Sequence, residues 1–185
     1  MNSFVRSTLA LLFLCLIAIS CSDDPVSSSD PGDQFSDSVP TGEIVPVEER
    51  NFVLTGFDDL SSKLVAENDG GQRWWLQIVS KVEYQNCPSH LQDEEVRLDN
   101  VYYGFAPDGR TYRRTGQTNS PTDIFGWEWK DASKNALHIR GNNDVDFVIT
   151  SLNDDEVVYA SVQNLGQGCT GTTWEQFGSP YTESN

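Results

Sequence analysis

Few residues of this chain have the type and spacing needed for acid–base or metal chemistry. Among its 185 residues there are two histidines, His90 and His138. His138 alternates with apolar neighbours and is expected on the outer surface of a strand, while His90 lies in a polar loop. The sequence has no Gly-x-Ser-x-Gly motif, no phosphate-binding glycine loop and no zinc-protease motif. These residues therefore predict neither an activated nucleophile nor a cofactor site.

Carboxylate pairs are the remaining catalytic candidates, because glycoside hydrolysis needs two acids on either side of the scissile bond. Three consecutive acids at 93–95 lie in a polar loop, where neighbouring side chains point apart. Asp144 and Asp146 share one strand face, and Glu128 belongs to another strand with outward acids. These acids are expected to form a solvated stripe. We therefore expect a protein without catalytic residues, metal or cofactor, and an unfamiliar catalytic arrangement is the last alternative.

The N-terminus has the pattern of an export signal. Arg6 is followed by an apolar run from Leu9 to Ile19, which is too short to span a bilayer. The Ala-Ile-Ser-Cys stretch ending at Cys21 resembles the lipobox of bacterial lipoproteins, whose cysteine thiol is acylated. The Ser-Asp-Asp that follows resembles the export tag of surface lipoproteins in Bacteroidota. The resemblance implies a lipoprotein of the outer membrane, exposed at the cell surface. An ordinary cleaved signal beside an unmodified cysteine is the alternative.

The acidity of the chain limits its partners. Removal of residues 1–20 takes one of the 12 basic residues and none of the 28 acidic ones, which leaves a formal charge of −17. Such a field repels nucleic acid and anionic membrane surfaces. The expected membrane attachment is therefore through acyl chains on Cys21, and stable anchoring needs more than one chain.

Composition divides the chain into three parts. Residues 1–20 are the predicted signal peptide, and residues 21–50 are a lipidated cysteine followed by a disordered acidic tether, because Ser, Asp, Pro and Gly dominate there. Residues 51–185 form one predicted domain, a suitable size for a single core. No internal repeat is visible within it.

The domain alternates apolar and polar residues in short runs, which is typical of β-strands. Alternation runs through 74–84, 125–129, 137–140 and 145–149, and 157–162 reads as a more buried strand. Pro107-Asp108-Gly109 predicts a tight hairpin, and 141–143 and 153–155 predict two more. The expected fold is all-β, an antiparallel up-and-down barrel of about eight strands with one short helix near 57–66.

Two further cysteines, Cys87 and Cys169, belong to the predicted domain. Disulfides persist in exported proteins, so these two are expected to pair. The first and last strands of an up-and-down barrel are neighbours, which agrees with this pairing. A free thiol or a metal ligand is the alternative, although the sequence has no Cys-x-x-Cys motif.

The order of these motifs resembles the lipocalin-like domains of Bacteroidota lipoproteins. A "Phe, two residues, Asp-Gly" hairpin ends at Gly109, and a "Gly-Trp" strand begins at Gly126. The resemblance covers about 58–165, but the glycine before Trp74 is one residue further away than in the family. It implies a barrel with room for one small ligand. The candidate lining residues are Trp74, Leu76, Phe105, Tyr112, Trp127, Trp129 and Phe147.

Five tryptophans leave the function open among three classes. They fill a core, or some of them line a cup for a small apolar ligand. Trp75 alternates outward from Trp74, and Trp174 lies near the C-terminus, so both suggest a glycan-binding surface instead. The third class is a structural subunit of an outer-membrane assembly, which contacts a protein partner through the outer surface of the domain.

Overall fold

Nine β-strands form one antiparallel sheet that closes on itself in the computed structural model, which describes residues 35, 37–60 and 71–182. The order is β2-β1-β3-β4-β5-β6-β7-β8-β9, and pairing of β1 with β9 closes a barrel of the eight strands other than β2. The predicted all-β barrel is therefore confirmed. The strands are β1 (Arg73–Gln85), β2 (Glu94–Arg97), β3 (Val101–Phe105), β4 (Arg110–Thr115), β5 (Thr122–Trp129), β6 (Ala136–Arg140), β7 (Val145–Leu152), β8 (Glu156–Gly166) and β9 (Cys169–Thr182).

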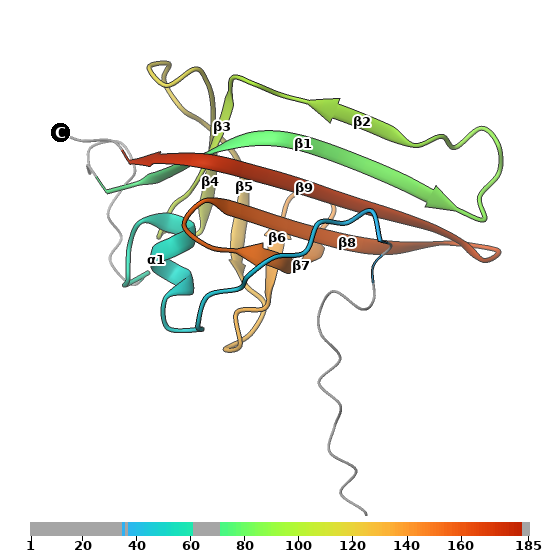
Figure 1. The fold of residues 1–185 in the computed structure, drawn as a ribbon, viewed down its shortest axis with the longest axis horizontal. Coiled ribbons are helices and arrows are strands. Elements are labelled where there is room, and N and C mark those ends of the chain that lie inside the picture. Colours follow the sequence, from blue (N-terminus) through green and yellow to red (C-terminus); the bar gives the residue numbers. More distant parts are fainter. Residues whose placement is uncertain (1–34, 36, 61–70, 183–185) are drawn as a thin grey trace, which may run out of the picture.

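Three strands are much longer than the others. β1, β8 and β9 have 13, 11 and 14 residues, while β3 to β7 have five to eight. They run side by side and extend beyond the short strands, so one wall of the barrel is higher than the other (Figure 1). The short strand β2 pairs with the far half of β1.

The predicted turns fall between the observed strands. Gly109 joins β3 to β4 with φ +79°, which glycine adopts without steric cost, and its N–H donates to the Ala106 carbonyl at 3.0 Å. The turns predicted at 141–143 and 153–155 lie between β6 and β7 and between β7 and β8. The three predicted turns therefore each separate two consecutive strands.

The described part of the chain contains one short helix, α1 (Arg50–Thr55), which covers one end of the barrel (Figure 1). Val53 and Leu54 are buried in the core, and the Trp75 indole Nε1 donates to the Leu54 carbonyl at 2.9 Å. The helix lies upstream of the predicted position near 57–66. Residues 57–60 are not helical, and 61–66 lie outside the described residues.

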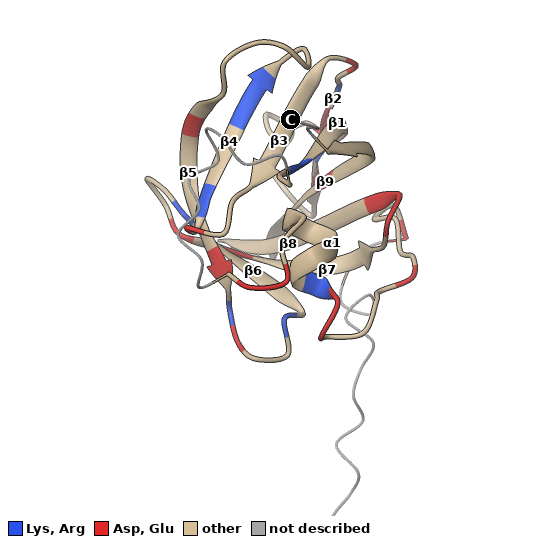
Figure 2. Ribbon diagram, turned by 90° about the vertical axis from the view of Figure 1, so that its left-hand side faces the viewer, with Lys and Arg blue, Asp and Glu red and all other residues tan. Residues whose placement is uncertain are grey.

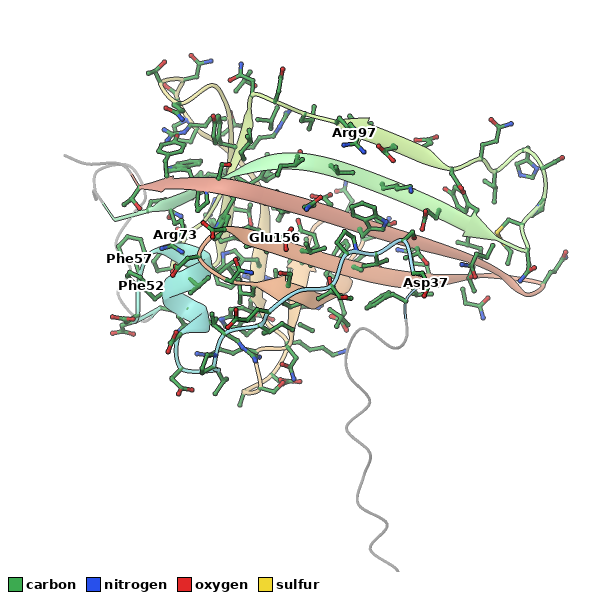
Figure 3. The ribbon with its side chains drawn as sticks, viewed as in Figure 1. Asp37, Phe52, Phe57, Arg73, Arg97 and Glu156 are labelled. Carbon is green, nitrogen blue, oxygen red and sulfur yellow. A yellow bond between two sulfur atoms is a disulfide. The ribbon has the colours of Figure 1, made fainter. Side chains whose placement is uncertain are left out.

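One arginine ties α1 to the start of β1. The Arg73 guanidinium donates to the Val53 carbonyl at 3.0 Å, pairs with Asp154 at 3.1 Å and lies 5.4 Å from the centre of the Phe52 ring. Figure 3 labels Arg73, Phe52 and Phe57 at this end of the molecule. A cation over an aromatic face and a bond to a helix carbonyl both hold the helix against the strand.

The chain before α1 also packs on the barrel. Gly42 N–H donates to the Thr150 carbonyl at 2.9 Å, and Ile44 forms a parallel bridge with Leu152 at the end of β7. Val39 is buried against Ala160 and Trp174 on the outer face of β8 and β9. The packed part of the chain thus begins before residue 51, where composition placed the start of the domain.

Cys87 and Cys169 form a disulfide, as predicted, with their Cα atoms 4.5 Å apart. The bond joins the end of β1 to the start of β9, far from α1 along the same two strands. It closes a loop across 82 positions of sequence. In the chain-entropy model such a loop contributes about 4–5 kcal/mol to stability.

The predicted signal peptide, Cys21 and most of the predicted tether lie outside the described residues. Among the described residues, no helix is long and apolar enough to cross a bilayer.

Candidate functional site

The two faces of β1 are the reverse of the prediction. Trp75, not Trp74, points into the barrel, where it is fully buried in the main core. Trp74 lies on the outer face, where the Arg114 guanidinium stacks 3.8 Å from the centre of its ring. Because opposite faces alternate along a strand, Gln77 also belongs to the inner face.

The seven predicted ligand residues divide between three places. Phe105 and Trp127 are fully buried in the core at the α1 end. Trp129 and Phe147 are partly buried and pack against that core. The other three lie on the outer face: Trp74, Leu76 and Tyr112. Tyr112 is placed there because it pairs directly with Gly104, whose missing Cβ would meet the Trp74 ring.

The tryptophans proposed to grip a glycan are both buried. Trp75 has no exposed surface, and Trp174 is 6% exposed beneath Val39 and Phe35. The prediction that these rings face solvent is therefore wrong. Trp75 is buried because it points into the barrel, beneath α1, and Trp174 is buried because the chain before α1 covers the outer face on which it lies.

The half of the barrel away from α1 is packed differently from the half beneath it. Beneath α1, large side chains fill the interior, among them Trp75, Phe105 and Trp127. Beyond them, inward-facing Ile139 and Phe147 stay partly exposed. These inward apolar side chains are less completely covered than those beneath α1, and we call this half of the barrel the open half.

A carboxylate stands among the inward residues of this open half. Glu175 of β9 accepts hydrogen bonds from the Tyr159 hydroxyl at 3.1 Å and from Gln77 Nε2 at 3.0 Å. Both bonds reach the same oxygen, Oε2. The two donors are 3% and 4% exposed, whereas Glu175 itself is partly exposed. Burial raises the pKa of the Glu175 carboxyl, and the two hydrogen bonds oppose that rise.

Charged and polar groups on β3 and β4 face the same space. Tyr103 pairs directly with Arg113, so both side chains point to the inner face. Burial raises the pKa of the Tyr103 hydroxyl and the nearby Glu175 charge adds to this, while Arg113 opposes it. Arg113 is exposed and therefore lies at the rim. Figure 2 shows basic positions along β4.

We define the inner cluster as Gln77, Tyr103, Tyr159 and Glu175. None of its members was predicted as a site residue. The alternation through 74–84 places Gln77 on the polar face, opposite Trp74 and Leu76, and Glu175 lies in a strand that sequence patterning does not identify. The available signal was the spacing of Thr173, Glu175 and Phe177, which places all three on one face of a strand, opposite Trp174.

The outer acidic residues already have partners. Asp146 pairs with Lys130 at 2.6 Å and with His138 at 2.7 Å, and both hydrogen bonds lower the pKa of the Asp146 carboxyl. Within the described residues, no three His, Cys, Asp or Glu side chains gather as a metal site. The outward His138 matches its predicted position on a strand surface.

A hollow of about 520 Å³ lies on the outer wall over Gly126. Two glycines, Gly109 and Gly126, line it, and its charged residues are Asp108, Arg110, Asp123 and Arg140. Arg110 is paired with Asp123, and Arg140 lies 4.0 Å from Glu128. Because these cations have carboxylate partners, the inner cluster is the stronger candidate site.

No protein-family model matches the sequence, and searches of curated proteins and solved structures gave no significant match.

The raised pKa of Glu175 predicts a specific effect of pH on stability. Between the ordinary glutamate pKa and the raised one, the folded protein binds more protons than the unfolded chain, so stability falls as pH rises through that window. Glu175→Gln removes this loss of stability, because glutamine does not ionise. We expect the variant to melt above wild type at pH 7 and to match it near the ordinary glutamate pKa or below. For a chain of this size, each kcal/mol moves Tm by about 2–4 °C.

The control for this experiment is Glu128→Gln, because the Glu128 side chain is 56% exposed on the outer wall. Thermal unfolding of the three proteins across pH gives the comparison. A Glu175→Gln variant that melts below wild type at pH 7 would show that the ionised carboxylate stabilises the fold, contrary to this account.

Proposed function

We propose that this protein is a membrane-anchored lipoprotein, displayed at the cell surface, whose barrel binds a small ligand in its open half without catalysing a reaction. The observation that carries the binding proposal is the partial exposure of the inward-facing side chains of Ile139 and Phe147, in contrast to the buried core beneath α1. A barrel plugged at one end and open at the other encloses a ligand from one side only.

The anchoring half of the proposal rests on sequence. A short apolar export signal ends at Cys21 in a lipobox-like motif, and the net negative charge of the chain disfavours electrostatic attachment to an anionic bilayer. Acyl chains on that thiol supply the attachment. The packed chain begins by residue 39 at the latest, which leaves a spacer between Cys21 and the barrel.

The binding proposal predicts that the aromatic wall of the open half contributes to affinity. The neutral probe 2-(2-naphthyl)ethanol, followed by fluorescence anisotropy with the full chain in nonionic detergent, should bind saturably. Phe147→Ala should weaken binding by about tenfold, because part of the apolar contact area is lost.

The matched control is Leu165→Ala, since Leu165 is exposed near the far tip of β8. It should bind the probe like wild type and corrects for partition of the probe into detergent. Circular dichroism verifies that both variants are folded. Unsaturable binding, or equal affinity of folded Phe147→Ala and wild type, would contradict a ligand site in the barrel.

The anchoring proposal predicts that one of two N-terminal thiols is modified. Wild-type protein made in an expressing bacterium should partition into the detergent phase of Triton X-114, and Cys21→Ser should move to the aqueous phase or stay unprocessed, without acyl mass by mass spectrometry. Cys15→Ser is the control, because Cys15 lies within the apolar run. Acylation that persists in Cys21→Ser would refute the assignment.

A further inference from the structure

One oxygen of the inner carboxylate has no partner among the described residues. Tyr159 and Gln77 both donate to Glu175 Oε2, and Oε1 receives no hydrogen bond from them. We propose that the open half of the barrel binds small amines with an aromatic or apolar body, and that the ligand's ammonium group donates to Glu175. This inference rests on the proposed function and names the class of ligand.

Aromatic rings extend from Glu175 along the inner wall, beginning with Tyr159, whose hydroxyl donates to the carboxylate. Tyr103 and Phe177 have ring centres 5.5 Å apart, and Phe177 and Tyr159 are 5.4 Å apart. The centre of the Phe147 ring lies 5.0 Å from the centre of the Tyr159 ring, so Phe147 extends this row of rings. These rings come from β3, β9, β8 and β7, so they curve around the inner wall. Ring faces attract cations, and ring edges pack against an apolar body.

The carboxylate of Glu175 favours a cation over an anion as the group bound beside it. A partly buried carboxylate loses hydration, and an ammonium brought into hydrogen-bond contact offsets that loss. A fatty acid would place its carboxylate against Glu175, or bury Glu175 beneath its alkyl tail, and both arrangements are costly. The formal charge of −16 for the whole chain also concentrates cations near its surface.

Arg113 sets the orientation of the ligand. It faces the same interior as Tyr103 but is exposed at the rim, and it makes no ion pair with a carboxylate of the described residues. The positive charge of Arg113 repels an ammonium group at the rim, and the carboxylate of Glu175 attracts it further inside the barrel. The ligand therefore enters with its amine first, and its outer end is neutral or acidic.

The test compares two probes of nearly equal shape on the full chain. These are 2-(2-naphthyl)ethylammonium and the neutral 2-(2-naphthyl)ethanol, measured by anisotropy at pH 7. Wild type should bind the amine about tenfold or more tightly than the alcohol, which is the effect of one charge-assisted hydrogen bond. Glu175→Gln should lose that preference while it keeps its affinity for the alcohol. The glutamine retains an acceptor for Tyr159 and Gln77, so the fold is preserved.

Glu128→Gln serves as the control and should keep the preference for the amine. Equal affinities of wild type for the two probes, or an amine preference that survives in Glu175→Gln, would overturn the inference and leave the ligand site itself standing. If neither probe binds, both the inference and the proposed function fail.

Discussion

The pairing of β1 with β9 is the interaction on which the rest of the structure depends. It closes the barrel along almost the full length of both strands, from Arg73 opposite Thr182 to Gln85 opposite Thr170. The Cys87–Cys169 disulfide lies just beyond the last of these pairs. The same pairing brings Gln77 to Glu175, although 98 positions separate them in sequence. Without closure there is neither an interior nor an inner cluster.

Two halves of one interior have different packing because different elements cover them. Under α1, indole and phenyl rings meet edge to face, and the ring centres of Phe105 and Trp127 are 5.8 Å apart. Buried indole nitrogens there donate hydrogen bonds to backbone carbonyls. In the other half no helix of the described residues packs on the interior, and the long wall of β1, β8 and β9 extends past the short strands (Figure 1). A carboxylate in that half lowers the stability of the free protein when ionised. Proteins tolerate such costs at binding sites, where a ligand supplies the missing partner.

Sequence patterning identified most strands and turns because period-2 alternation and turn residues are local properties. It failed for β9, whose Gly171, Gly178 and Pro180 are poor strand formers. Gly178 is placed by tertiary contact, since a Cβ there would lie 2.7 Å from the Ile78 side chain.

The prediction assigned the two faces of β1 the wrong way round for a related reason. Its outer face is apolar because Arg114, Tyr181 and the chain before α1 cover it, while its inner face carries the polar Gln77 of the cluster. Alternation shows which face of a strand is apolar. In a barrel whose interior contains the inner cluster, the apolar face of a strand need not be its inner face. Register shifts between Trp74 and Leu76 and between Gln77 and Val79 add to the difference. The site itself was not predictable from one sequence, because it joins residues from four strands.

The central claim is that burial raises the pKa of the Glu175 carboxyl, and that one of its oxygens has no hydrogen-bond partner among the described residues. The most direct measurement is a ¹³C NMR titration of its carboxyl group, assigned by comparison with Glu175→Gln. The account predicts a titration midpoint above the ordinary glutamate value of about 4.3, and a lower midpoint when the naphthylethylammonium probe is bound. A midpoint at the ordinary value that does not move with the probe would contradict it.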